Sequence, residues 1–345
     1  TGVEGKVGDN NVTFVFNETT RKFTANYTPR TKGEYPITGS YSLASDCNVI
    51  NGTLTVNGVY DFIELQDLIN ATAPNTILYL NGTNYTAKPG QSEVIINKNI
   101  TITGGSIVDS SLMSTLDAKG QCRIMNITDG VSVTLKNIIF TNGKSSSEGG
   151  AIYNNGGNFT VTDSIFINTT SNRYGGAIYK NSTDSNFTVT NSSFINTTAR
   201  DGGAIYACNK GDLIVSNSSF INTTSRLSSG GAIYTHNNIL NFTVTDSTFT
   251  NTKANTFGGA ITSNNNGDFI VSNSSFINTR SIMSGGTIYA NNKGDLIVSN
   301  SSFINTTSTN GNGGAIFTYS NIRNVTVTDS TFNSPNANGI AIIYI

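Results

Sequence analysis

The sequence predicts an all-β chain whose C-terminal three quarters wind into a right-handed parallel β-helix. Three repeating phrases predict this fold. Gly-Gly-Ala-Ile-Tyr returns about every 26–28 residues, Phe-Ile-Asn interleaves with it, and an alternating run such as Phe-Thr-Val-Thr lies between them. Each repeat thus holds three short β-prone runs and no run of helical periodicity. We therefore expect one coil per repeat and about ten coils in all.

The paired glycines predict a corner in each coil. A corner needs either a positive φ or a very close approach of two backbones, and glycine allows both. The pair leads into a strand rather than a helix, which argues against a phosphate-binding loop. Copies of the pair begin at Gly149, Gly175, Gly202, Gly230, Gly258, Gly285 and Gly313, and a degraded copy begins at Gly339.

Residues 1–58 have a different sequence pattern from the repeats. Short alternating runs at 12–16, 22–27, 35–41 and 52–56 are separated by turn residues, which is typical of a β-sandwich. A full immunoglobulin-type sandwich needs about 100 residues. We therefore expect an incomplete Ig-like β-sandwich here.

One helix is predicted between the sandwich and the repeats, at 61–71. Its apolar residues fall on one face at helical spacing and are Phe62, Leu65, Leu68 and Ile69. Because an open end of a β-helix would template aggregation, we expect this helix to cover that end. Residues 59–75 are therefore assigned to a capping helix and linker, and 76–345 to the β-helix.

Alternation within the third phrase predicts which residues point inward. Phe159, Val161 and Asp163 share one face, and Thr160 and Thr162 share the other. The Asn or Asp that ends this face in every repeat predicts a structural ladder at a turn, where its side chain bonds the backbone and its neighbours. A row of ligand carboxylates is the alternative, although Asn interrupts it. The column comprises Asp163, Asn191, Asn217, Asp246, Asn273, Asn300 and Asp329.

A second column is aromatic and follows the inward Ile of the Gly-Gly phrase. Because neighbouring residues of a strand point to opposite faces, these aromatic side chains should face outward. They either offer stacking surfaces to sugar rings or form a cross-coil ladder that only stabilises the sheet. The column comprises Tyr153, Tyr179, Tyr206, Tyr234, Tyr289 and Phe317.

Composition and charge narrow the function. The chain carries 20 Lys and Arg against 21 Asp and Glu, a net charge of −1. This balance indicates no nucleic-acid partner, for which a basic stripe is expected. With no signal peptide and no apolar run of about 20 residues, the chain is expected to be a mature or excised extracellular segment without a membrane span. Candidate N-glycosylation sites are Asn26, Asn51, Asn99, Asn126, Asn158, Asn186, Asn241 and Asn324.

Metal and cofactor chemistry is not indicated. Cys47, Cys122 and Cys208 are too scattered for a disulfide scaffold and are interpreted as small hydrophobic residues. His236 is the only histidine, so a zinc site is not expected. We predict no cofactor.

The repeat phrases resemble those of chlamydial polymorphic outer membrane proteins, and the whole chain resembles the adhesin-like surface proteins of methanogenic archaea. The likeness covers the Ig-like region, the helix and the Asn- and Thr-rich repeats, and 115–127 also fits it. In the chlamydial motif Asn comes three residues after Phe, whereas here it comes two after. The resemblance implies a cell-surface β-helix protein.

The sequence therefore predicts a non-catalytic, adhesin-like surface protein whose partners are other cells, glycans or surface polymers. A structural subunit that joins end to end by β-strand addition into a filament or sheath is a second interpretation. A polysaccharide-active β-helix enzyme is a third, but glycoside hydrolysis needs two carboxylates about 5–9.5 Å apart. Asp109, Asp117 and Asp201 have no evident partner in the sequence.

Overall fold

The computed structural model describes two units of the chain, Thr1–Val59 and Tyr60–Ile345. The division falls one residue beyond the predicted boundary at 58. The described residues are 2–7, 10–17, 22–24, 33–43, 46–56, 60–182, 184–208, 210–236, 239–319, 321–340 and 342–345.

The first unit contains one antiparallel sheet in the order β3-β2-β1-β4-β5. Val12 and Phe14 are buried while Thr13 between them is exposed, as alternation requires. A sandwich needs a second facing sheet, and the described residues of this unit form one sheet, so the Ig-like assignment stays a prediction. The strands are β1 (Gly2–Val7), β2 (Asn10–Asn17), β3 (Lys22–Thr24), β4 (Gly33–Leu43) and β5 (Asp46–Val56).

The helix α1 (Phe62–Ala71) begins with a capping box. Asp61 Oδ1 accepts hydrogen bonds from the backbone N–H groups of Ile63 and Glu64, both at 3.0 Å. The Glu64 carboxylate in turn accepts from the Asp61 N–H at 2.7 Å. These bonds satisfy N–H groups that a helix start leaves without partners, which stabilises it by about 1 kcal/mol.

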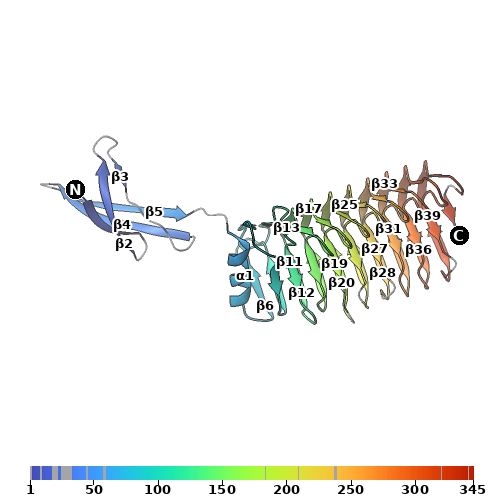
Figure 1. Ribbon diagram of the computed structural model, residues 1–345, viewed down its shortest axis with the longest axis horizontal. Helices are drawn as coiled ribbons and strands as arrows, with labels where there is room; N and C mark the ends of the chain where they lie inside the picture. Colours follow the sequence, from blue (N-terminus) through green and yellow to red (C-terminus); the bar gives the residue numbers. More distant parts are fainter. Residues whose placement is uncertain are drawn as a thin grey trace. The chain divides into compact units, whose positions relative to one another are not determined.

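The helix α1 lies at the end of the first coil (Figure 1). Its buried face packs against β7 (Tyr85–Thr86) and β8 (Val94–Ile96). Phe62, Leu65 and Ile69 are buried and join the core of the β-helix. Leu68 was predicted to share this face, and that prediction is wrong because its side chain is 40% exposed. Positions i, i+3 and i+7 define the stripe, and Leu68 lies about 100° around the helix from Ile69.

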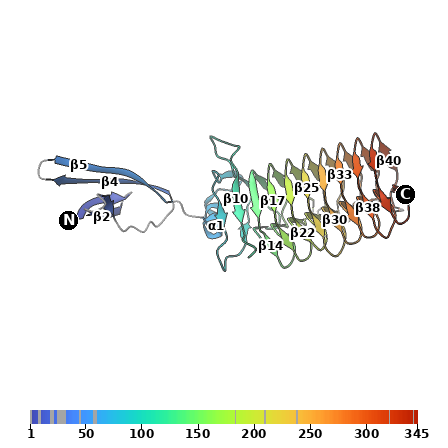
Figure 2. The same ribbon diagram turned by 90° about the horizontal axis from the view of Figure 1, so that it is seen from above.

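The second unit is a parallel β-helix, which confirms the fold predicted from the repeats (Figures 1 and 2). Three sheets have ten strands each. The first sheet contains β6 (Thr76–Tyr79), β9 (Ile100–Thr103), β12 (Val133–Lys136), β16 (Phe159–Thr162), β20 (Phe187–Thr190), β24 (Leu213–Ser216), β28 (Phe242–Thr245), β32 (Phe269–Ser272), β36 (Leu296–Ser299) and β40 (Val325–Thr328). The second contains β7 (Tyr85–Thr86), β10 (Ser114–Asp117), β13 (Ile138–Thr141), β17 (Ile165–Ile167), β21 (Ser193–Ile195), β25 (Ser219–Ile221), β29 (Thr248–Thr250), β33 (Ser275–Ile277), β37 (Ser302–Ile304) and β41 (Thr331–Asn333). The third contains β8 (Val94–Ile96), β11 (Met125–Ile127), β15 (Ile152–Asn154), β19 (Ile178–Lys180), β23 (Ile205–Ala207), β27 (Ile233–Thr235), β31 (Ile261–Ser263), β35 (Ile288–Ala290), β39 (Ile316–Thr318) and β43 (Ile343–Tyr344).

A fourth sheet of eight two-residue strands lies between the second and third sheets, and the first two coils lack such a strand. The sequence predicted three strands per coil, and this short strand was missed because two residues carry no readable periodicity. It contains β14 (Lys144–Ser145), β18 (Thr170–Ser171), β22 (Thr198–Ala199), β26 (Thr224–Ser225), β30 (Lys253–Ala254), β34 (Arg280–Ser281), β38 (Thr307–Ser308) and β42 (Asn336–Ala337).

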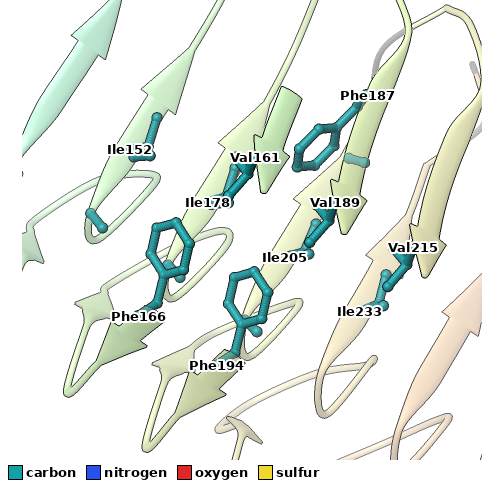
Figure 3. Packing of buried hydrophobic residues seen from close by; sticks show 14 of the residues in the cluster. Ile152, Val161, Phe166, Ile178, Phe187, Val189, Phe194, Ile205, Val215 and Ile233 are labelled. Atoms are coloured by element: carbon teal, nitrogen blue, oxygen red, sulfur yellow. The ribbon is translucent and has the colours of Figure 1, made fainter. Parts of the chain in front are cut away.

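Identical residues stack in register to form the core. Figure 3 shows Phe166, Phe194 and the Val and Ile columns pointing into the space that the coils enclose. The phenylalanines of the second sheet stack with ring centroids 4.7–4.9 Å apart from Phe140 to Phe332. That spacing matches the distance between hydrogen-bonded strands, so backbone pairing and ring stacking reinforce one another.

The two glycines of each corner have different roles. The first, such as Gly149 with φ of 60°, adopts a left-handed conformation. The second allows close approach, because a Cβ on Gly150 would lie 2.2 Å from the carbonyl oxygen of Gly176 on the next coil. Both predicted reasons for glycine are thus present, one at each position.

We expect Phe220→Ala to destabilise the β-helix by about 3–5 kcal/mol, because it empties a core position between two stacked rings. The Phe220 ring lies 4.8 Å from that of Phe194 and 4.7 Å from that of Phe249. Ile221→Ala, on the half-exposed outer side of the same strand, should cost about 1 kcal/mol or less. Urea unfolding followed by circular dichroism measures both, and equal losses would contradict the assigned inward and outward faces.

Candidate functional site: the outward columns of the β-helix

The predicted Asn/Asp column lies where each strand of the first sheet ends. All seven residues have φ between 46° and 51°, the left-handed conformation that Asn and Asp tolerate best. Asn191 Nδ2 donates to Asp163 Oδ1 at 3.1 Å, and Asn217 Nδ2 donates to Asn191 Oδ1 at 2.5 Å. Thr245 donates to the Asp246 carboxylate at 2.9 Å. This geometry favours a structural ladder over a row of metal ligands.

One detail of that column differs from the prediction. Asp163 was placed on the inward face with Phe159 and Val161, but its side chain is 36% exposed. Its left-handed φ of 50° breaks the strand alternation and turns the carboxylate outward. Ser164 takes the inward position and is fully buried.

A more continuous ladder, which the sequence analysis did not assign, is formed by the asparagines of the Phe-Ile-Asn phrase. We name it the Phe-Ile-Asn ladder; its members are Asn168, Asn196, Asn222, Asn251, Asn278 and Asn305. Each has φ of 51–55°. The Nδ2 of each donates to the Oδ1 of the previous one at 3.1–3.2 Å. The signal was the Asn two residues after Phe in these six repeats, which was interpreted from the sequence only as a marker of the repeat.

The aromatic column forms a stack along the third sheet. Ring centroids are 5.3 Å apart for Tyr153 and Tyr179, 5.6 Å for Tyr179 and Tyr206, and 4.9 Å for Tyr206 and Tyr234. Thr262 replaces the aromatic residue in the next coil and interrupts the stack. The stack resumes between Tyr289 and Phe317, at 5.2 Å.

Neighbouring corners partly cover these rings. Tyr174 stacks on Tyr206 at 4.6 Å, and Phe257 packs on Tyr289 at 4.5 Å. Tyr206 is buried, with 8% of its surface exposed. Burial raises the pKa of Tyr234 to about 12 and also raises the pKa of Tyr206. The arrangement favours the stabilising alternative over a sugar-stacking platform.

Most candidate glycosylation sites lie at the corner that leads into the first sheet. Asn158 Oδ1 accepts from the N–H of Asn186 at 2.9 Å, and Asn186 Oδ1 accepts from the N–H of Asp212 at 3.0 Å. Asn241 Nδ2 donates to Asp212 at 3.0 Å. Asn126 is half-buried beside Glu93 in the third sheet. The exposed members are Asn99, Asn158, Asn186, Asn241 and Asn324, whereas Asn26 and the side chain of Asn51 lie outside the described residues.

The isolated acids each have a local structural partner. Asp117 pairs with Lys119 at 2.9 Å. Asp109 accepts from the N–H of Ser111 at 2.9 Å, and Asp201 lies 3.6 Å from the Arg200 guanidinium.

Metal-ligating side chains do not gather within the part of the chain that the structure describes: no group of three or more His, Cys, Asp or Glu could hold an ion there. His236 lies beside the tyrosine stack, 6.3 Å from Tyr206 and 6.5 Å from Tyr234 between ring centroids. Burial raises the pKa of the Cys122 thiol to about 11 and also raises that of Cys208. The side chain of Cys47 is not among those described.

Lys180 is a buried cation that the sequence analysis missed. Its side chain points inward from β19 and is fully buried. Nζ donates to the carbonyl oxygens of Gly156 and Gly157 at 2.5 and 2.8 Å, to Ser182 at 2.6 Å, and to Asn154 at 3.3 Å. Burial lowers its pKa to about 7. The signal was a Lys at the inward position that neighbouring coils fill with Asn and Ala.

Among the described residues no helix is both long and apolar enough to cross a membrane. No family model, curated protein or solved structure matches this chain. Function is therefore inferred from the chain's own residues.

Lys180 should make stability depend on pH between about 7 and 10.5. The folded state favours the neutral amine, so the unfolded chain binds more protons in this window and the free energy of unfolding rises with pH. The slope should approach about 1.4 kcal/mol per pH unit. Lys180→Met should flatten it, whereas the exposed control Lys210→Met should not. Urea midpoints at several pH values measure the slope, and parallel profiles for wild type and Lys180→Met would contradict this assignment.

Proposed function

We propose that this chain is an extracellular, cell-surface, adhesin-like protein whose β-helix presents an extended face to cells, glycans or surface polymers. One observation carries the proposal: the solvent-facing groups recur coil after coil. The Phe-Ile-Asn ladder places an amide at the same position of six successive coils, from Asn168 to Asn305. A surface of this kind suits a long partner that is contacted many times.

The chemistry of repeated contacts supports adhesion. Each hydroxyl or amide exchanges bonds with water for bonds with a ligand and gains little by itself. Repetition along a rigid support makes later contacts effectively intramolecular, so many weak contacts add up to tight attachment. A catalytic site instead relies on a few convergent groups with perturbed pKa values inside a pocket.

Two other functions, a structural subunit and a polysaccharide-active enzyme, would give different results in the test described below. A structural subunit would form long regular polymers, visible by electron microscopy. A polysaccharide-active enzyme would release new reducing ends or unsaturated ends from a polysaccharide. Neither is favoured by a specific contact among the described residues, so adhesion is the function proposed.

The test is retention of protein-coated beads under flow on mucin, chitin and polygalacturonate surfaces. We expect retention on at least one surface, rising steeply with the density of protein on the bead. No retention on any surface, release of reducing ends, or assembly into ordered polymers would each contradict adhesion.

Changing the Phe-Ile-Asn ladder should weaken retention. In the triple variant Asn196→Gly, Asn222→Gly and Asn251→Gly, glycine keeps the left-handed backbone but removes the amides, and we expect about fivefold less retention. The control is Asn191→Gly, Asn217→Gly and Asn273→Gly, which makes the same change in the other Asn/Asp column. Equal loss in both variants would show that the ladder amides act only through stability.

A further inference from the structure

Cations gather beside the Phe-Ile-Asn ladder, on the outer side of the fourth sheet. Parallel pairing aligns Lys144, Thr170, Thr198, Thr224, Lys253, Arg280 and Thr307 in one column. Figure 2 shows β14, β22, β30 and β38 of this sheet in a row along one side of the β-helix. We name the combination of this column, the ladder beside it and the residues that follow each strand the fourth-sheet face.

The residues that directly follow each strand of the fourth sheet are mostly polar or cationic. They are Ser146, Asn172, Arg200, Arg226, Asn255, Ile282 and Thr309. From Lys144 to Thr309, no Asp or Glu occupies any position of the three columns. Most acids of these coils flank the first sheet, at positions such as Asp212 and Asp268 on one side and Asp163 and Asp246 on the other. Glu148 and Asp201 lie just beyond the third column and pair with Arg173 and Arg200. Although the net charge is −1, cations are therefore concentrated on the fourth-sheet face and most acids lie beside the first sheet.

Four of these cations have no carboxylate partner among the residues that the structure describes. Lys144, Arg226, Lys253 and Arg280 are exposed and take part in none of the ion pairs found among the described residues. Arg226 is held across two coils, because its Nη2 donates to the carbonyl oxygen of Ser171 at 3.0 Å. Arg280 Nε donates to Thr309 Oγ1 on the next coil at 3.1 Å. These bonds leave other N–H groups of both guanidinium groups available for a ligand.

The face is also hollowed at its N-terminal end. An open groove of about 650 Å³ is lined by Lys119, Gly120, Asn142, Gly143, Lys144, Asn168, Thr170, Asn172 and Arg226. A second groove of about 380 Å³ adjoins it and shares Gly120, Lys144 and Asn172. The first groove is bordered by the cations of Lys144 and Arg226 and floored by amide, hydroxyl and backbone groups. This lining matches a ligand that carries both negative charge and hydroxyl groups.

We propose that the fourth-sheet face binds a linear acidic polysaccharide, whose carboxylate or sulfate groups pair with Lys144, Arg226, Lys253 and Arg280. Coils lie ~4.8 Å apart, so the charges of Lys253 and Arg280 are about one coil apart. The Arg226 side chain reaches back to Ser171, so its charge lies about one coil from the strand that holds Lys144. The Asn and Thr side chains between them can donate to and accept from sugar hydroxyl groups. This inference names a ligand class for the adhesion proposed above and rests on it.

A nucleic acid fits this face less well than a polysaccharide. The three columns contain no aromatic side chain on which a base could stack. Four unpaired cations spread over about six coils also fall far short of the charge density of a nucleic acid, about one phosphate per 1.7 Å of duplex. Widely spaced acidic sugars match the spacing of the cations better.

The test is titration calorimetry of the full chain with sodium polygalacturonate, dextran sulfate, uncharged dextran and a thymidine oligonucleotide. Polygalacturonate or dextran sulfate should bind, with affinity that falls as salt rises. The stronger of the two identifies the carboxylate or the sulfate as the recognised group. Lys253→Glu with Arg280→Glu should raise the dissociation constant at least about tenfold.

The matched control is Lys210→Glu with Lys293→Glu, which makes the same charge change at exposed positions off the three columns. Equal weakening by both double variants, tighter binding of the oligonucleotide, or no binding of either acidic polymer would overturn the inference. If the acidic polymers fail while mucin or chitin still retains coated beads, adhesion stands and only this ligand class falls. If no surface retains the coated beads and no polymer binds, the proposed adhesive function is contradicted as well.

Discussion

In-register parallel pairing between coils is the interaction on which the rest of this structure depends. Each strand bonds to its counterpart one coil away, so residue positions repeat every coil at strand spacing. A side chain is therefore stacked on its own repeat. An inward Phe contacts another Phe, and an outward Asn bonds another Asn. A change of one residue in register would turn every core side chain toward solvent, and the corner glycines fix the register by close approach.

The interior shows how far this stacking tolerates polar residues. A Ser column behind the first sheet is buried but satisfied, because Ser192 donates to the carbonyl of Thr190 at 2.8 Å and accepts from the N–H of Ser164 at 3.2 Å. A Thr column before the fourth sheet is also buried, and the hydroxyls of Thr169, Thr197, Thr223, Thr252 and Thr306 have no hydrogen-bond partner among the described residues. Where Thr287 replaces the usual Ala, its hydroxyl lies 2.5 Å from that of Thr279. That pairing explains how Thr is accommodated at the Ala position of this Gly-Gly-Ala phrase.

The sequence allowed the coil, the inward Phe and Val columns and the corner glycines to be predicted, because each is a local pattern that repeats. It did not predict the fourth sheet, since two-residue strands have no period. Nor did it place Asp163 correctly, because a left-handed residue ends the alternation on which the prediction relied. Lys180 escaped notice for a different reason: strand alternation places it inward, two residues after Ile178, but a buried Lys is unexpected, and its partners in the previous coil come from distant sequence.

The cations of the fourth-sheet face also could not be grouped from the sequence, because residues of different coils come together only in the folded chain. In the sequence, Lys144, Lys253 and Arg280 stand 27 or more positions apart in nearly neutral chain, and no basic stripe is visible. Winding places all three in one column, because each stands at the same position of its coil. Net charge is thus a poor guide to the partners of a solenoid. What matters is the charge of each column, since a long ligand lying along the axis meets one column rather than one stretch of sequence.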